Sequence, residues 1–412
     1  MQPLKITIYG DFWDCQIYMG RLYLWTINGE LRIYNWYELV MSFIKTEEEA
    51  VALRCAFTNG DYLYGYHLQI IFKDNEFKNL LLKKFKALSE RVLEFADHEI
   101  KEFQISVQDN PFKDLQTDSE ILNKKLYGVT DSGFLSVTAH RPKSDKYLAG
   151  TKSTKIWDCP LLSIKADKYA KIALSGGSEG LFQYDAQEKK EFGFLDDFLR
   201  VEERIGQINK KHSLFANWAN LSIYNSSNID EDYMAVFKWV KEEVNQELPQ
   251  KEEKYNRTFT SIVSETSIFN SNTKKYLSWG SKDKIFRAKE TGVDIVSFNN
   301  NAREDENLFS EVKHIPLMEW KGNVICGGTS YFGTIIECDN ALVVALSNGK
   351  SLTINGSITR WRVYPRSINY ENHLHVVLDD RIEIYSFNHD YFIDQYSKDF
   401  GMTYVNSSKK KF

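Results

Sequence analysis

The feature that most constrains this chain is a two-residue turn motif placed between β-prone runs. Residues 22–27 and 30–34 are rich in β-branched, aromatic and other apolar side chains, and Asn28-Gly29 separates them. Asn and Gly both accept a positive φ, which a type I′ turn requires at its two central positions. The sequence therefore predicts a β-hairpin over residues 22–34.

The same hairpin pattern returns from one end of the chain to the other. Two β-prone runs around a short turn are found again at residues 341–354 and 373–385, with weaker copies at 125–137, at 171–184 and around Asn59-Gly60. One blade of a β-propeller is a four-stranded antiparallel sheet, which cannot bury both of its faces alone. Aromatic residues make up 14% of the sequence, and such side chains suit the wide surfaces between stacked blades.

Short motifs accompany the hairpins. Trp13-Asp14 and Trp157-Asp158 stand ahead of two of them, and double glycines occur at Gly176-Gly177 and Gly327-Gly328. With the repeated strand–hairpin units, the chain resembles a β-propeller of the broad WD40-like or Kelch-like kind. The resemblance implies an all-β fold of about seven blades, which we expect to form a single domain over residues 1–412. Because no Gly-His dipeptide of the WD40 type is present, no functional residue of either family is assigned.

The two ends of the chain are expected to meet. Residues 6–9 and 382–385 both alternate β-branched or aromatic residues with polar ones. A ring of blades leaves an open sheet edge unless its first and last strands pair. The N-terminal and C-terminal strands are therefore predicted to share one blade.

Three segments are predicted to be helical insertions. Between residues 74 and 95 apolar residues recur every three or four positions, and Asp74 is a suitable N-cap. This amphipathic helix lies in the first predicted insertion, residues 74–102. The other two insertions are predicted at residues 195–210 and 230–255.

Charge, cysteine content and the first residues bound the class of protein. The chain has 52 Lys and Arg against 57 Asp and Glu, a net charge of -5, which argues against general binding to nucleic acid or to anionic membranes. Five cysteines at wide spacing match neither a disulfide framework nor a metal clip. The N-terminal residues show no signal-peptide pattern and no apolar run has the length of a membrane span. We expect a cytoplasmic protein with reduced thiols that does not bind membranes.

One group of residues supports an enzymatic alternative. His373 and His375 alternate along a predicted strand and so share a face, and Asp379 follows closely. These residues would suit a metal site in a propeller hydrolase or lyase that acts on a small molecule or a glycan. The glycine-containing segments around Ser178 and Lys350 lack the strand-to-helix context of a nucleotide loop, so no cofactor is expected.

An arginine-rich strand supports a second alternative. Arg360, Arg362 and Arg366 are interleaved with Trp361 and Tyr364, a composition found in nucleic-acid-binding surfaces. The competing interpretation is an arginine ladder that pairs with acids of a neighbouring blade.

The function favoured by these observations is a non-enzymatic interaction scaffold or adaptor within a larger assembly. A propeller core does not need a helix of about 20 residues, so the apolar stripe of the first insertion must bury against the ring or against a partner. Aromatic and arginine side chains carry much of the energy of protein interfaces. The predicted partner-binding residues are Phe77, Phe85, Arg360, Arg362 and Arg366.

Overall fold

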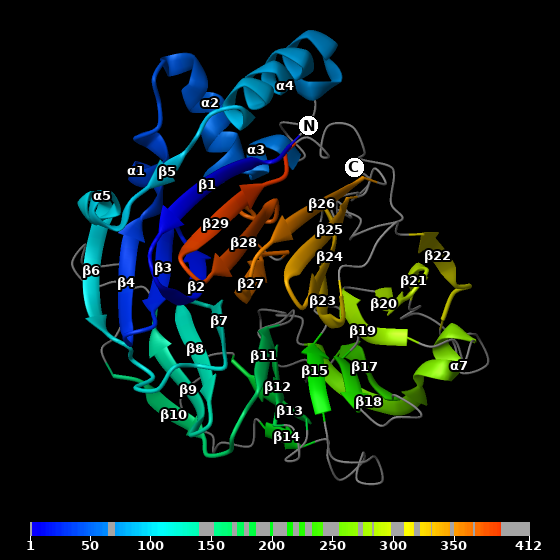
Figure 1. The fold of residues 1–412 in the computed structure, drawn as a ribbon. Helices are drawn as coiled ribbons and strands as arrows, with labels where there is room; N and C mark the ends of the chain where they lie inside the picture. The colour runs from blue at the N-terminus through cyan, green and yellow to red at the C-terminus, as the bar shows by residue number, and fades with distance from the viewer. Residues whose placement is uncertain are drawn as a thin grey trace, which may run out of the picture. The chain divides into compact units, whose positions relative to one another are not determined.

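The computed structural model describes most of the chain (Figure 1). The chain forms two compact units. The first unit comprises Met1–Lys113, Ser144–Leu148 and Glu319–Phe412, and the second comprises Asp114–Lys143 and Ala149–Met318. The described residues are 2–64, 71–139, 152–166, 171–176, 181–186, 198–200, 212–216, 222–226, 233–241, 255–270, 275–281, 284–297, 309–316, 322–330, 332–346, 350–365 and 367–388.

The first unit contains three antiparallel sheets, one of which also gains a parallel strand at its edge. Their strand orders are β2-β3-β4-β6, β23-β24-β25-β26 and β27-β28-β29-β1-β5. The bounds are β1 Leu4–Tyr9, β2 Phe12–Tyr18, β3 Arg21–Thr26, β4 Glu30–Asn35, β5 Glu94–Phe95, β6 Gln104–Asp109, β23 Val324–Ser330, β24 Gly333–Cys338, β25 Ala341–Leu346, β26 Ser351–Asn355, β27 Ile358–Val363, β28 His373–Leu378 and β29 Arg381–Ser386.

The second unit contains three four-stranded sheets and two hairpins. The orders are β10-β9-β8-β7, β11-β12-β13-β14, β19-β20-β21-β22, β15-β16 and β17-β18, and β16 lies beside β17. The bounds are β7 Asp118–Leu122, β8 Lys125–Thr130, β9 Gly133–Thr138, β10 Thr154–Trp157, β11 Ser163–Ala166, β12 Lys171–Ser175, β13 Leu181–Asp185, β14 Phe198–Arg200, β15 His212–Ala216, β16 Ser222–Ser226, β17 Tyr233–Lys241, β18 Tyr255–Ser264, β19 Lys275–Ser281, β20 Lys284–Lys289, β21 Gly292–Ser297 and β22 Lys313–Pro316. The helix α7, Glu265–Phe269, follows β18.

These sheets are propeller-type blades, so the predicted fold class is confirmed. Four-stranded sheets made of strands consecutive in sequence are the repeating element of that fold. The first strands β2, β19, β23 and β27 also share a detail: the pairing register shifts by one residue directly after the first paired residue. These four sheets therefore share one bulged first strand, whereas β7 and β11 pair with the next strand without such a shift. The number of blades and the single-domain organisation stay predictions.

The closing sheet joins the two ends of the chain. Strand β1 pairs antiparallel with β29, with Ile6 opposite Ile384, where the sequence analysis placed the shared blade. On its other side β1 pairs in parallel with β5, where Thr7 lies opposite Glu94. Strand β1 therefore has neighbours on both sides (Figure 1).

Two glycines illustrate how tightly the blades are built. Gly133 and Gly292 begin β9 and β21 with φ of +135° and +143°. A Cβ atom would lie 2.2 Å from the carbonyl oxygen of Trp157 at Gly133, and 2.1 Å from that of Ile315 at Gly292. Only glycine allows the neighbouring strand to approach so closely.

A helical insertion connects β4 to β6 in the first unit. It contains α1 Trp36–Met41, α2 Glu47–Phe57, α3 Asp61–Tyr64, η1 Ile71–Lys73, α4 Asn75–Ser89, α5 Asp97–Ile100 and η2 Lys101–Phe103. The helix expected after residue 74 is present as α4, with the Asp74 carboxylate accepting a hydrogen bond from the backbone N–H of Glu76. The insertion begins much earlier than expected, at Trp36. Its apolar residues join the core of β1, β2 and β29.

Three local predictions are wrong. Residues 233–241 form the strand β17 rather than a helix, because they pair along their whole length with β18, and sheet pairing outweighed the three- and four-residue spacing of the apolar residues. Within 195–210, Phe198–Arg200 is a strand that pairs with β13, and the rest of that segment lies outside the described residues. Asn59-Gly60 does not turn a hairpin but follows α2, where the N–H of Asn59 donates to the carbonyl of Arg54.

Candidate functional site

The carboxyl end of α2 is attached to the closing sheet by hydrogen bonds. The last carbonyl groups of a helix have no partner within it. In α2 the Ala56 carbonyl accepts from His373 Nε2 at 2.9 Å, Asn372 Nδ2 at 3.0 Å and Ser386 Oγ at 2.7 Å. All three donors come from β28, β29 or the residue before them. The C-terminal strands β28 and β29 thus hold the carboxyl end of α2, a helix near the N-terminus.

Two buried histidines continue this network in one direction. His373 donates from Nε2 to Ala56, so its Nδ1 must accept, and it lies 3.4 Å from His375 Nε2. His375 then donates from Nε2, and its Nδ1 accepts from the Tyr364 hydroxyl at 3.2 Å. Both rings are fully buried. Burial lowers the pKa of His373 to about 4, and burial followed by the neighbouring His373 lowers the pKa of His375 further below its usual value.

Aromatic packing holds the same junction. Trp36 donates from Nε1 to the Phe57 carbonyl at 2.6 Å. The rings of Trp36 and Phe57 pack edge to face at 6.3 Å, and the Phe57 ring packs against His373 at 5.9 Å. The insertion is therefore a fixed part of the first unit.

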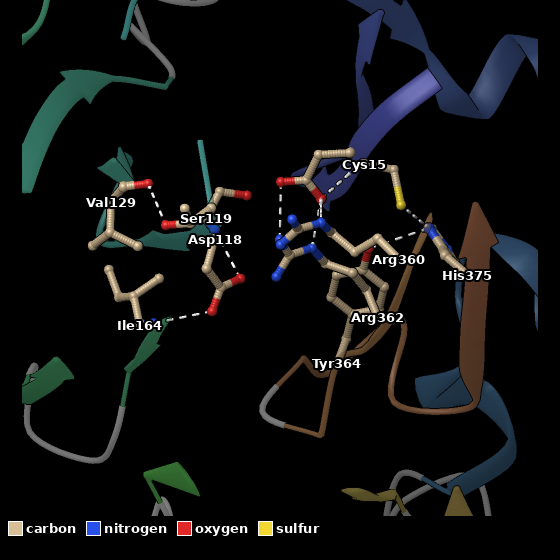
Figure 2. Close-up of polar contacts among 11 residues, drawn as sticks. Cys15, Asp118, Ser119, Val129, Ile164, Arg360, Arg362, Tyr364 and His375 are labelled. Carbon is tan, nitrogen blue, oxygen red and sulfur yellow. Dashed lines mark hydrogen bonds and ion pairs between the residues drawn. The ribbon is translucent and has the colours of Figure 1, made fainter. Parts of the chain in front are cut away.

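The predicted arginine strand faces another strand rather than solvent. Arg362 on β27 binds Asp14 on β2 through two parallel contacts, Nε–Oδ1 at 2.8 Å and Nη2–Oδ2 at 2.9 Å (Figure 2). Asp14 is fully buried and Arg362 is nearly so. Arg360 lies 3.7 Å from the same carboxylate and over the Trp13 ring. This is the arginine ladder of the competing interpretation, and Arg366 lies outside the described residues.

The histidines do not form the alternative metal site. Asp379 is exposed in the turn that follows β28, whereas His373 and His375 lie in the core. Within the described ranges no group of three or more His, Cys, Asp or Glu side chains is placed to hold a metal ion.

Cys15 lies near these histidines but is not activated. Its Sγ is 3.9 Å from His375 Nδ1. Burial, and then the adjacent Asp14 carboxylate, raise the pKa of the Cys15 thiol far above its usual value. A nucleophilic cysteine needs the opposite shift. Cys15 and His375 are therefore packed core residues and not an activated cysteine–histidine pair.

The second unit contains a local arrangement like that of Asp14. Asp118 on β7 accepts from the backbone N–H of Ser119 at 2.9 Å through Oδ1, and from that of Ile164 on β11 at 3.0 Å through Oδ2 (Figure 2). Asp14 likewise accepts from the N–H of the next residue, Cys15, at 2.8 Å. In each case an aspartate on the first strand of a sheet binds a residue of another sheet, β27 for Asp14 and β11 for Asp118. The sequence analysis did not identify either residue.

The helix α4 presents apolar side chains to solvent. Phe77 is 57% exposed and Leu80, one turn further, is 54% exposed. Phe85, which was predicted beside Phe77 on a partner surface, is fully buried in the core with Leu81 and Leu88. Phe77 lies one turn before Leu81 on the same side of α4. Leu81 is buried and Phe77 is exposed, so the first turn of α4 projects past the core surface against which the rest of the helix packs.

An ion pair brings α2 against this part of α4. Lys84 Nζ on α4 binds Glu48 Oε2 on α2 at 2.9 Å. Leu80 lies one turn before Lys84, and Val51, which is 58% exposed, lies one turn after Glu48. We call Phe77 and Leu80 the α4 face.

A sequence signal for α2 was present. Thr46 precedes Glu47, Glu48 and Glu49, and a threonine followed by acidic residues marks the start of a helix.

No helix among the described residues is both long and apolar enough to cross a bilayer.

The comparisons with known proteins bear on the fold alone. No family model matches the sequence, and no curated protein matches it. Among solved structures, Raptor from Chaetomium thermophilum is 10% identical, with a TM-score of 0.45 over 93% of this chain and 27% of Raptor. YCF48 bound to a D1 peptide is 8% identical, with a TM-score of 0.41 over 94% of each chain. Hsv2 from Kluyveromyces lactis is 13% identical, with a TM-score of 0.37 over 71% of this chain and 79% of Hsv2. What identifies this chain as a propeller-type protein is its own series of four-stranded blades.

Proposed function

We propose that this protein is a non-enzymatic interaction scaffold that holds a protein partner on the α4 face. The observation that supports the proposal is the exposure of Phe77 and Leu80 on α4, a helix whose other face is already buried in the core of the first unit. Apolar side chains grouped on a helix and left in water are typical of binding surfaces.

The attachment of the insertion supports the same proposal. Three donors on the Ala56 carbonyl fix α2, and the Lys84–Glu48 pair connects α2 to α4. Rigid presentation lowers the entropy lost on binding, which is a large cost of association. Complete burial of a Phe or Leu side chain contributes about 1.5–3 kcal/mol, so Phe77 and Leu80 together suit an anchor of moderate strength.

The two alternatives have less support. The enzymatic alternative rested on His373, His375 and Asp379, which the described structure separates into core and surface. The nucleic-acid alternative rested on the arginine strand, where Arg362 is committed to Asp14. The metal-ligand group that motivated the first alternative is not assembled among the described residues, and Arg362, central to the second, binds a buried aspartate instead of facing solvent.

The test is co-purification from the native cells with a tagged full-length chain. We expect one stoichiometric protein that survives high salt with the wild type and is lost with Phe77→Ser/Leu80→Ser. The matched control is Ile325→Ser/Val107→Ser, which removes two exposed apolar residues of other strands in the same unit and should keep the partner. Thermal unfolding of each variant checks folding. A wild-type chain without any partner, or a partner kept equally by both double variants, would contradict the proposal.

A further inference from the structure

The charge of α4 differs from that of the whole chain. Residues Asn75–Ser89 contain four lysines and one glutamate, whereas the chain has a net charge of -5. The glutamate, Glu76, lies in the first turn, where a negative charge stabilises the helix. The lysines lie mainly toward the carboxyl end, so the α4 face is basic on one side.

Two of these lysines remain available to a partner. Lys84 is paired with Glu48, and the neighbouring Glu49 is paired with Arg91 at 2.7 Å. Lys83 and Lys86 are exposed, and neither side chain forms an ion pair with another residue of the described ranges. Lys83 lies one turn after Leu80, so positive charge directly adjoins the exposed apolar residues.

A protein segment fits this surface better than a lipid bilayer. An amphipathic helix that lies on a membrane buries a broad apolar face in the acyl region. The broad apolar stripe of α4, formed by Leu81, Phe85 and Leu88, is already buried in the core. What remains is a pair of apolar side chains one turn apart beside lysines, which matches a segment with two apolar anchors and acidic residues next to them.

We propose that the α4 face binds an acidic segment of a partner protein. Two apolar side chains of that segment contact Phe77 and Leu80, and its carboxylates lie over Lys83 and Lys86. This inference depends on the proposed scaffold function and specifies its partner. Carboxylates opposite lysines mainly raise the association rate and exclude basic competitors, while the apolar anchors supply most of the affinity.

The test uses synthetic peptides of about 16 residues, long enough for partial helix formation. Three peptides share one Phe and one Leu at positions i and i+3, and carry Glu, Gln or Lys at all flanking positions. Binding to the full-length chain is followed by fluorescence anisotropy at about 50 and 500 mM salt. We expect the Glu peptide to bind at least about tenfold more tightly than the Gln peptide at low salt, with no binding of the Lys peptide.

Two double variants separate the charge from the apolar anchors. Lys83→Glu/Lys86→Glu should reduce affinity for the Glu peptide by about tenfold or more, whereas Lys152→Glu/Lys165→Glu, which makes the same change in net charge at exposed positions of the second unit, should not. Phe77→Ser/Leu80→Ser should abolish binding of every peptide.

Three results would overturn the inference: equal binding of the Glu and Gln peptides, no binding of the Glu peptide at about 100 μM, or preference for phosphatidylcholine–phosphatidylserine vesicles over the Glu peptide. A native partner that is lost with Phe77→Ser/Leu80→Ser but kept by Lys83→Glu/Lys86→Glu would reject the acidic segment and leave the scaffold function intact.

Discussion

At the scale of single residues, one row of hydrogen bonds in the core runs in a single direction. The Tyr364 hydroxyl donates to His375, His375 donates to His373, and His373 donates to the Ala56 carbonyl. Each ring uses one nitrogen as donor and the other as acceptor, which is possible only while both histidines are neutral. The network therefore depends on the protonation state of two side chains.

Stability is predicted to decrease as the medium becomes acidic. The folded-state pKa of His373 is lowered by burial from 6.5 to about 4, so below pH 6.5 the unfolded chain binds a proton that the folded chain does not. The contribution is complete above about pH 6.5 and is lost as the pH falls toward 4. It amounts to about 3 kcal/mol for His373, and His375 adds to it in the same direction. Urea unfolding between about pH 7 and pH 4 measures this slope.

The control for this prediction replaces a histidine outside the core. His373→Gln should flatten the dependence of unfolding free energy on pH, because glutamine does not titrate and its amide still donates to Ala56. His98→Gln, at an exposed position, should leave the slope unchanged. Equal slopes for the wild type and His373→Gln would show that His373 is not responsible.

At the scale of elements, buried charge connects one sheet to the next. The two parallel contacts between the Arg362 guanidinium and the Asp14 carboxylate join β27 to β2. Taking one member away leaves the other charge buried without its partner, and such a loss costs about 3–5 kcal/mol, whereas replacing both with neutral groups of similar size costs far less.

The pair is predicted to behave non-additively. Arg362→Met should lower the free energy of unfolding by about 3–5 kcal/mol, and Asp14→Asn/Arg362→Met by clearly less than that. Chemical denaturation of the two single variants and the double variant gives the coupling energy. If the effects of the single variants simply add in the double variant, the contact does not join the two sheets energetically.

The elements that the sequence predicted are those encoded locally. The hairpin over residues 22–34 and the helix start at Asp74 are both present. The turn is not the expected type I′, because only Gly29 of the two turn residues has a positive φ, +81°, and its N–H donates to the Thr26 carbonyl at 3.1 Å. Residues 233–241 were assigned wrongly because Val, Phe, Tyr and Trp suit both periods over a short run, and pairing with β18 decided between them.

The candidate site was only partly predictable. The sequence placed Phe77 on an amphipathic helix but could not show where the core surface beneath α4 ends, and this boundary separates exposed Phe77 from buried Phe85. In the same way, Arg362 resembled a surface contact until its partner, 348 positions away, was known. Separation of this size cannot be read from local patterns.

At the scale of the whole molecule, the first strand of the chain joins residues from its two ends in one sheet. The backbone of β1 pairs with β29 and β5, its side chains Leu4, Ile6 and Ile8 are buried in the core of the first unit, and Lys5 binds Glu383 at 3.0 Å. Burial raises the pKa of Glu383, but hydrogen bonds from Tyr385 and Lys5 outweigh this effect, so that its pKa is lowered. The carboxylate is therefore charged when it meets Lys5.

Deletion of residues 1–9 is predicted to destabilise the sheet in which β1 pairs with β29 and β5. Burial of three aliphatic side chains contributes about 1.5–3 kcal/mol each, so we expect the melting temperature to fall by roughly 10 °C or more. The unpaired edges of β29 and β5 should also promote self-association, which light scattering would detect. Adding a synthetic peptide of residues 1–11 should restore both properties. A truncated chain that stays monomeric with an unchanged melting temperature would contradict the prediction.

The position of β1 also has a consequence for synthesis on the ribosome. Lys5 and Glu383 are 378 residues apart, so at about 5–20 residues per second the first strand waits roughly twenty seconds to over a minute for β29. Strand β5, which is made far earlier, can shelter one edge of β1 during that interval. Because β5 covers one edge of β1, the nascent chain exposes fewer unpaired backbone N–H and C=O groups to neighbouring chains on a polysome. The insertion that contains β5 would thereby protect the chain from aggregation during its synthesis.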